Sequence, residues 1–326
     1  MPGLKVVFAG LLCLAAALGS DVGHATDWPQ KPVRIIVPFP AGGSADGQAR
    51  IVAQRFGKTF GQQFVVENRV GAGGALAVEA VVRAPADGYT LLWGIQPQIV
   101  VLPAMMDVRY DSQKDLVPIS VLGTNPFVLV INSKLPVKSL KDFVSYVQGL
   151  DKPLPYGTSG VGSIAHLSMA LFAERAKLNA IAVHYKGNAP ALSDVLAGHI
   201  PAMFATLADA LSQAQSLDLR IVAVTGQTRA GQLPDVPTIA ESGYPDFSVV
   251  TWNGLMAPAG TPAVIVDKIA GELAQAVKDP DFAARVTKFG VDPLGNSPRA
   301  FAELIAAELP LWKKAVGIAG VNLKEK

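Results

Sequence analysis

Apolar positions alternate between strand-like and helix-like spacing along the first third of the chain. The β-branched run at residues 34–37 predicts a strand, and residues 49–60 place apolar side chains at i, i+3, i+4, i+7 and i+11, which predicts an amphipathic helix. A strand, a helix and a strand are predicted next at residues 64–66, 74–82 and 89–93. Strands that alternate with helices are typical of a parallel sheet covered by helices.

A second alternating run begins at residues 127–131 and predicts a second lobe of the same type. Its predicted helices are residues 139–146, 163–175 and 191–197, and its predicted strands are residues 154–156, 182–185 and 219–224. Beyond Pro262 the pattern is helical, and a further helix begins at Ser297-Pro298, because proline favours the first helical position. No strand is predicted in this tail, so we expect its helices to pack back on the first lobe.

The first 25 residues have the pattern of a signal peptide. Lys5 precedes an apolar stretch too short for a membrane anchor, which needs about 20 residues, and small residues lead to Ala25. We therefore expect export to the periplasm, with the mature chain starting near Thr26. Cys13 is the one cysteine and lies in this segment, so the mature chain is expected to lack disulfides and thiol chemistry.

Composition favours a globular protein with a weak electrostatic signature. The chain has 326 residues, 50% of them hydrophobic and 17% charged, with a formal net charge of +2. Single cores stop growing at about 250–300 residues, which supports two lobes. Acidic and basic residues are interspersed, so neither nucleic acid nor an anionic membrane surface is indicated as a partner.

Two glycine-rich loops occupy equivalent places in the two lobes. Residues 38–46 (PFPAGGSAD) and residues 155–163 (PYGTSGVGS) each follow a predicted strand and lead into a predicted helix. The first N–H groups of a helix are unpaired and the dipole is positive there, so such a loop suits an anion. We interpret the two loops as a clamp around one anionic ligand. Glycine turns also serve purely structural roles, and that alternative stays open for either loop alone.

Motifs for catalysis or cofactor binding are incomplete. Residues 57–59 (GKT) resemble the end of a phosphate-binding loop, but Val52 replaces its first glycine. Residues 160–165 lack the acidic partner of a dinucleotide site, and Val161 breaks the nucleophile motif around Ser159. No cofactor, metal or catalytic residue is therefore predicted. The histidines of the mature chain, on three separate predicted elements, are His166, His184 and His199.

Seven segments together are similar to one family. They are PFPAGGSAD (38–46), VVENRVGAGG (65–74), PADGYTLLWG (85–94), YGTSGVGS (156–163), HYKGNAPALSDVLAGHI (184–200), PDVPTIAESGYPDF (234–247) and TWNGLMAPAGTP (251–262). In this order they resemble the Bug-type receptors of tripartite tricarboxylate transporters. The resemblance covers essentially the whole mature chain.

The resemblance implies a type II periplasmic-binding-protein fold, with two doubly wound α/β lobes around a central ligand cleft. It also implies that the chain crosses between the lobes near Asn125 and near Val250. After the signal peptide, residues 26–124 would form the first part of lobe 1, residues 125–249 lobe 2, and residues 250–326 the second part of lobe 1.

The function implied by this family is capture of a small organic carboxylate. The lobes would close around a mono- or dicarboxylate, aromatic acids included, and present it to integral membrane permease subunits. We expect a monomer that is not an enzyme. Two alternatives stay open: a ligand-sensing receptor for a membrane signalling partner, and a two-lobed α/β enzyme acting on a carboxylate.

The resemblance also implies which residues bind the ligand, namely those at positions that match the motifs of the family. The resemblance places one end of the ligand against the first loop, the other carboxylate against the second loop, and Tyr185 in the cleft wall. Asp46 lies in the first helical turn, where a cap or dipole partner is the alternative to a ligand contact. The residues concerned are Phe39, Ala41, Gly42, Gly43, Ser44 and Asp46 for the first loop and Thr158, Ser159, Gly162 and Ser163 for the second.

Two departures from the family pattern bear on specificity. Ala205 and Thr206 stand where many relatives carry an Asp that can pair with an ammonium, so we expect a plain carboxylate rather than an amino acid. Gln96 and Gln98 replace the residues usual after Gly94 and are candidate specificity residues. Two aromatic residues could stack on an apolar ligand or pack in the core, namely Trp93 and Trp252.

Overall fold

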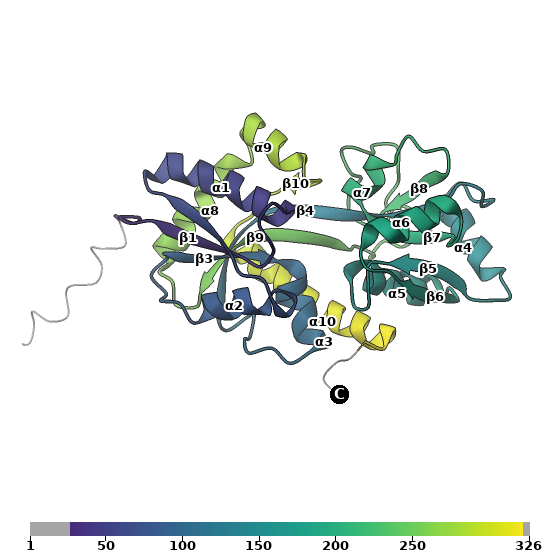
Figure 1. The fold of residues 1–326 in the computed structure, drawn as a ribbon, viewed down its shortest axis with the longest axis horizontal. Coiled ribbons are helices and arrows are strands. Elements are labelled where there is room, and N and C mark those ends of the chain that lie inside the picture. Colours follow the sequence, from purple (N-terminus) through teal and green to yellow (C-terminus); the bar gives the residue numbers. More distant parts are fainter. Residues whose placement is uncertain (1–26, 322–326) are drawn as a thin grey trace, which may run out of the picture.

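The computed structural model describes residues 27–321, which fold into two lobes, each with its own sheet (Figure 1). In the first lobe β1 (Val33–Val37) pairs in parallel with β2 (Phe64–Asn68) and β3 (Thr90–Ile95). In the second lobe β5 (Leu154–Thr158) pairs in parallel with β6 (Ala180–His184) and β7 (Ala202–Thr206). These are the parallel α/β units that the hydrophobic pattern predicts, and the two-lobed α/β fold is confirmed.

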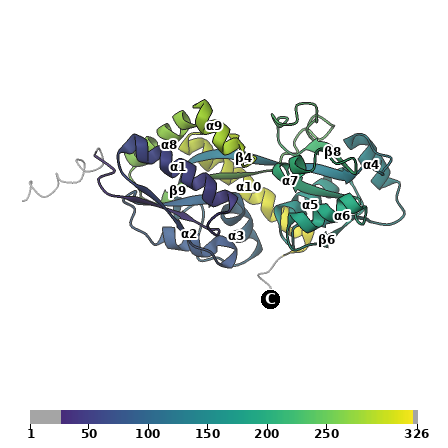
Figure 2. The same ribbon diagram turned by 45° about the horizontal axis from the view of Figure 1, so that its top comes forward.

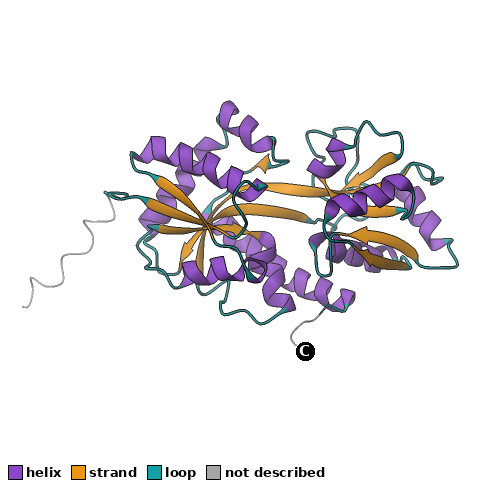
Figure 3. Cartoon of the chain, in the orientation of Figure 1, coloured by secondary structure: helices purple, strands orange, loops and turns teal. Residues whose placement is uncertain are grey.

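Antiparallel strands complete both sheets, which are therefore mixed (Figure 3). The long strand β4 (Leu116–Asn132) pairs with β9 (Val250–Pro258) in the first lobe and with β7 and β8 (Leu219–Val224) in the second, and the short β10 (Asp292–Pro293) also pairs with β4. The sequence pattern misses β9, β7 and the first half of β4. Their side chains are buried almost throughout, so the alternation that marks a half-exposed strand is absent.

Strands β4 and β9 carry the chain between the lobes. Their pairing ends at Pro126 with Val250, and from Phe127 onward β4 pairs with β7 instead. Figure 1 shows these two strands side by side as the bridge between the lobes. A ligand held between the lobes therefore lies against two continuous strands that belong to both.

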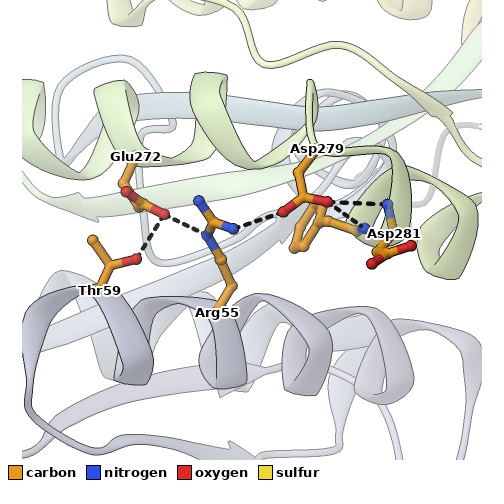
Figure 4. Close-up of polar contacts among 6 residues, drawn as sticks. Arg55, Thr59, Glu272, Asp279 and Asp281 are labelled. Atoms are coloured by element: carbon orange, nitrogen blue, oxygen red, sulfur yellow. Dashed lines mark hydrogen bonds and ion pairs between the residues drawn. The ribbon is translucent and has the colours of Figure 1, made fainter.

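Helix α1 (Ser44–Phe60) is fixed to the first lobe by its apolar face and by a partly buried cluster of ion pairs. Ala49, Val52 and Phe56 are fully buried in that lobe's core. On another face, Arg55 Nε donates to Glu272 Oε1 at 2.7 Å, and Arg55 Nη1 donates to Asp279 Oδ2 at 2.9 Å (Figure 4). These contacts tie α1 to α8 (Ala263–Ala276) and to the start of α9 (Pro280–Thr287), so its N-terminus has a fixed place.

Helices cover the sheets of both lobes (Figure 2). In the first lobe, a short turn of 3-10 helix (Ala72–Gly74) leads into α2, and a π-helical turn (Pro97–Val101) leads into α3. The remaining helices are α2 (Ala75–Val82), α3 (Leu102–Met105), α4 (Leu140–Gln148), α5 (Ile164–Ala176), α6 (Asn188–Ala197), α7 (Leu207–Ser212) and α10 (Pro298–Ala319).

The last helix, α10, departs from the expectation that the tail packs on the first lobe alone. Near its start, the Phe301 ring meets the Trp252 ring of β9 edge-on at 4.8 Å. Near its end, Lys314 Nζ lies 3.0 Å from Glu174 Oε1 of α5 in the second lobe. The helix is therefore a third connection between the lobes, as Figure 1 also shows.

Two further properties of residues 27–321 bear on function. No helix in this part of the chain combines the length and apolar character needed to cross a membrane. Nor do these residues bring three His, Asp or Glu side chains together in an arrangement that could hold a metal ion. The expected signal peptide, residues 1–25, lies outside the described residues.

Candidate ligand cleft

A cavity of about 570 Å³ lies between the two lobes. One wall is the β1–α1 loop with the first turns of α1, and the opposite wall is the junction of β7 and α7. The bridging strands β4 and β9 and the loop after α9 close its sides. The lining residues are Phe39, Pro40, Gly43, Ser44, Ala45, Gln48, Asn125, Thr206, Leu207, Ala208, Asp209, Thr251, Asn253, Phe289 and Gly290.

The β1–α1 loop leaves the N-terminus of α1 open toward the cavity. Gly43 occupies the N-cap position and offers no capping side chain, so the first N–H groups of α1 have no partner within the helix. Gly42 has φ +83°, a left-handed conformation that glycine adopts without strain. The loop therefore presents backbone donors and the Ser44 hydroxyl to the cavity.

Asp46 holds this loop from behind. Its Oδ2 accepts from Gly42 N at 3.0 Å and from Arg50 Nε at 2.8 Å, and the hydrogen bond from Arg50 lowers the pKa of Asp46 to about 2. Asn68 Nδ2 donates to Asp46 Oδ1 at 3.0 Å and to Phe39 O at 2.9 Å. Asp46 does not line the cavity, so in this structure it positions the loop.

Side-chain amides connect the first-lobe wall to the bridging strands. Asn253 Nδ2, in β9, donates to Gln48 Oε1 at 2.9 Å and to Asn125 Oδ1 at 3.2 Å. Gln48 Nε2 donates in turn to Ser44 Oγ at 2.9 Å. Because Ser44 Oγ already accepts from Gln48, its proton is free to be donated to a ligand. The network thus orients a hydroxyl donor beside the open helix end.

The second-lobe wall is capped by its own side chains. Thr206 is the N-cap of α7, and its Oγ1 accepts from Asp209 N at 3.2 Å while donating to Asp209 Oδ2 at 2.7 Å. Asn188 Nδ2, at the start of α6, donates to the same Oδ2 at 2.9 Å. The Asp209 carboxylate therefore has a fixed place on this wall.

The loop after α9 forms one side of the cavity, and no motif in the sequence predicts that it does so. A Cβ atom at Gly47 of α1 would lie 2.6 Å from the Phe289 ring, so this ring rests directly on the α1 backbone. A Cβ at Gly290 would lie 3.2 Å from Ala208 Cβ, across the cleft. Asn125 Nδ2 donates to Gly290 O at 2.8 Å. The loop thus touches both lobes and a bridging strand.

Four of the predicted site residues line this cavity, namely Phe39, Gly43, Ser44 and Thr206. Three others, Ala41, Gly42 and Asp46, belong to the same loop but are not among the lining residues. The two lobes therefore meet at a cavity to which the first predicted loop contributes directly.

The second predicted loop, residues 158–163, lies outside the cavity wall. Burial lowers the pKa of His166 to about 4, and the neutral ring accepts from Gly162 N through Nδ1 at 3.1 Å. Ser163 Oγ accepts from His166 N at 3.3 Å, and Thr158 Oγ1 is 2.8 Å from His184 Nδ1. These groups are thus occupied within the second lobe.

Other contacts of this region are also internal. Tyr185 donates its hydroxyl proton to Asp194 Oδ2 at 2.6 Å. Neither Tyr185 nor Ser159 is among the residues that line the cavity. A side chain at Gly162 would overlap Met105 of α3, so this loop already touches the first lobe. Since β5 and β7 are parallel neighbours, the loop leaves the same sheet edge as the cavity wall.

The candidate specificity residues are buried away from this cavity, so a role for them in ligand binding stays a prediction. Gln96 is fully buried and donates through Nε2 to Val250 O at 3.0 Å and to Glu308 Oε2 at 3.1 Å. Gln98 donates to Gly73 O at 2.9 Å, and Ala205 is fully buried. The indole rings of Trp93 and Trp252 are also fully buried. This favours packing in the core over stacking on a ligand.

Asp209 changes the expectation about amino acids. A plain carboxylate is expected because Ala205 and Thr206 replace an acidic residue, yet Asp209, three residues beyond Thr206, is an acidic residue of the cavity wall. Sequence signals for the missed residues exist: Asn125 and Asn253 are polar residues inside buried strands, at the expected crossings. Nothing in the local sequence marks Phe289 and Gly290, which reach the cavity only through tertiary packing.

Two α/β lobes joined by shared strands, with a cavity between them lined by an open helix end, define a two-lobed ligand-binding protein. Residues 48–321 match the family model described as "Tripartite tricarboxylate transporter family receptor". The chain belongs to this family, which confirms the resemblance found in its motifs.

Individual relatives support the same assignment. Protein BugT of Bordetella pertussis is 34% identical over 317 residues, covering 97% of this chain and 97% of BugT. The solved structure described as "R. palustris Rpa4515 with adipate" is 34% identical, with a TM-score of 0.73, covering 90% of this chain and 98% of that chain. MatC from Rhodopseudomonas palustris with bound malate is 32% identical, with a TM-score of 0.69, covering 89% and 100%.

Proposed function

We propose that this protein captures a small organic carboxylate in the periplasm and delivers it to the membrane subunits of a tripartite tricarboxylate-type transporter. The cavity between the lobes carries this proposal, because its first-lobe wall offers unpaired helix N–H groups beside the Ser44 hydroxyl. Adipate and malate, named with two relatives, are carboxylates, which supports this ligand class. The protein would release its ligand unchanged, since family membership gives it the role of a receptor.

The strength of such a site comes from several contacts together. A helix dipole contributes about 0.3–1 kcal/mol, or up to ~2 kcal/mol when partly buried, whereas micromolar affinity needs about 8 kcal/mol. Charge-assisted hydrogen bonds add about 1.5–3 kcal/mol each. Backbone N–H groups and Ser44, joined by contacts from the opposite lobe, could therefore supply the affinity once closure excludes water.

The body of the ligand would be apolar. Phe39, Leu207 and Phe289 line the cavity from three different elements, and 38% of Phe39 is exposed. A hydrocarbon chain or ring placed among them would bury apolar surface worth about 25 cal/mol per Å². The second loop, with Thr158, would join the site on further closure, as the family resemblance implies.

The proposal is tested by thermal unfolding of residues 26–326 with mono-, di- and tricarboxylates. Ligand at about 100 times Kd adds about 2.7 kcal/mol, which raises Tm by several degrees for a chain of this size. Ser44→Glu should abolish the rise, because it places a negative charge at the open helix end. Ser163→Glu should abolish it only if the second loop joins the site.

Two controls make the outcome decisive. Ser145→Glu, in α4 and outside the cavity, should keep the full rise in Tm. Mass spectrometry of the recovered ligand should return it unchanged, whereas turnover would favour an enzyme. If no carboxylate raises Tm, or if Ser44→Glu still responds fully, the proposed function is wrong.

A further inference from the structure

The two walls of the cavity are built alike but differ in charge. Each is the first turn of a helix that follows a strand, and each helix carries an Asp as its third residue, Asp46 in α1 and Asp209 in α7. A carboxylate in this position interacts favourably with the positive helix end. The walls differ in whether a cation offsets the carboxylate and whether the acidic residue lines the cavity.

In α1 the carboxylate is neutralised and turned away. Asp46 forms an ion pair with Arg50 at 2.8 Å, and only 4% of its side chain is exposed. The cavity therefore meets the backbone N–H groups and Ser44 in place of Asp46. This wall is electropositive and suits a carboxylate.

In α7 the acidic residue lines the cavity, and its carboxylate is bonded to neutral groups instead of a cation. Asp209 lines the wall, and its Oδ2 accepts from Thr206 and Asn188, which are neutral donors. Within residues 27–321 no Lys, Arg or His forms an ion pair with Asp209, and no basic side chain lines the cavity. The Asp209 N–H, moreover, is already bonded to Thr206 Oγ1. This wall is electronegative.

Building on the proposed function, we infer that Asp209 makes the cavity selective for ligands with a single carboxylate. That carboxylate binds at the α1 wall, and a second anionic group at the far end of the ligand is repelled by Asp209. An uncharged or ammonium end is accepted. Asp209 is then a specificity-determining residue, and the ligand is not the dicarboxylate that two equivalent anion loops would hold.

Three ligands of equal chain length test this inference: hexanoate, adipate and 6-aminohexanoate. They differ only at the far end, which is a methyl, a carboxylate or an ammonium group. Isothermal titration of residues 26–326 at neutral pH and low salt should give hexanoate an affinity at least about tenfold above that of adipate, because like charges placed together oppose binding. The affinity for 6-aminohexanoate should equal or exceed that for hexanoate.

Removal of the charge should remove the discrimination. Asp209→Asn keeps an oxygen acceptor for Thr206 and Asn188, and it should raise the ratio of adipate affinity to hexanoate affinity about tenfold. Asp235→Asn is the matched control, because it removes an equal charge from an exposed site of the second lobe outside the cavity. Its adipate-to-hexanoate ratio should equal that of the unmodified protein.

A measurement on the unmodified protein tests the inference even if the Asp209→Asn chain does not fold. Added salt screens charge, so it should narrow the gap between adipate and hexanoate in the unmodified protein. Equal affinity for both at low salt, or an unchanged ratio in folded Asp209→Asn, would overturn the inference and leave carboxylate binding intact. If neither these ligands nor any other carboxylate binds, the proposed function fails and the inference fails with it.

Discussion

At the scale of single residues, polar groups buried between the lobes connect the parts of the molecule. Glu308 of α10 accepts from Trp252 Nε1 at 3.0 Å and from Gln96 Nε2, and the same Gln96 nitrogen reaches Val250 O at the crossing of β9. One carboxyl group thus joins the long helix, the residue that follows β3, and the bridge. Burial raises the pKa of Glu308 to about 7.

The raised pKa predicts a pH dependence of stability. Between about pH 4.5 and 7 the folded chain keeps a proton on Glu308 that the unfolded chain has lost, so the free energy of unfolding falls as pH rises through this window. The loss approaches about 3 kcal/mol above pH 7. Glu308→Gln should remove this dependence and be more stable than the unmodified protein at pH 8.

Urea unfolding across this pH range measures the effect. Near pH 4 the two proteins should differ little, because Glu308 is then protonated in both states. Glu303→Gln on the same helix is the control, since that side chain is exposed and its ion pair with Arg299 lies at the surface. A stability difference between Glu308→Gln and the unmodified protein that is equal at pH 5 and pH 8 would contradict the assignment.

At the scale of elements, one ion-pair cluster adds to the apolar packing that places α1. Glu272 is 7% exposed and accepts from Arg55 and from Thr59 Oγ1, while Arg55 also reaches the N-cap residue of α9, Asp279 (Figure 4). The cluster joins the second half of α1, whose first turns line the cavity, to α8 and α9. Its loss should therefore affect both stability and binding.

Arg55→Met is expected to reduce the free energy of unfolding by about 2 kcal/mol. The substitution keeps an apolar side chain but leaves the buried Glu272 without its cation, and removing one partner of a buried pair costs about 3–5 kcal/mol before allowance for the partial exposure of Arg55. For a chain of this size Tm should fall by about 4–8 °C. Differential scanning calorimetry measures it.

Arg299→Met is the matched control. Its ion pair with Glu303 is exposed on both sides, and such pairs contribute about 0–1 kcal/mol. A Tm shift of Arg55→Met no larger than that of Arg299→Met would show that the cluster contributes nothing beyond a surface pair.

The elements also show how far sequence reasoning reaches. Helix α1 and strands β1, β5 and β8 follow from periodicity, since each has a clear apolar pattern and turn residues at its ends. Strands β4 and β9 do not, because a strand buried on both faces in the middle of a sheet has no alternation to detect. The same difference holds for the residues that line the cavity. Those of the β1–α1 loop can be predicted from the local sequence, whereas Asn253 and Phe289 reach the cavity through contacts between distant segments.

At the scale of the whole molecule, the lobes meet at the cavity mouth through the α9–β10 loop and α7. A Cβ at Gly290 would lie 3.2 Å from Ala208 Cβ, so the double variant Ala208→Cys, Gly290→Cys should form a disulfide under oxidising conditions, with some strain because Gly290 has φ +72°. The bond would join the lobes across the cleft and prevent their relative movement. Ligand association should then slow by about tenfold or more, as it does when binding requires a conformational change that is blocked.

Stopped-flow binding with and without reductant measures this effect in one sample. Reduction should speed association in the double variant, whereas reductant should not change the rate of either single cysteine variant. A disulfide that forms without any change in association rate would mean that ligand entry does not require these segments to separate.

The position of β9 constrains the order in which the chain can acquire its structure. This strand lies between β3 and β4, so the sheet of the first lobe is split until residue 250 and its successors are present. The intervening stretch, by contrast, holds the second half of β4 together with β5 through β8, all paired with one another in one sheet, and can assemble from its own residues. A growing chain would thus complete its middle before its beginning, and the N-terminal half-lobe must wait, with apolar surface uncovered, for the last quarter of the polypeptide.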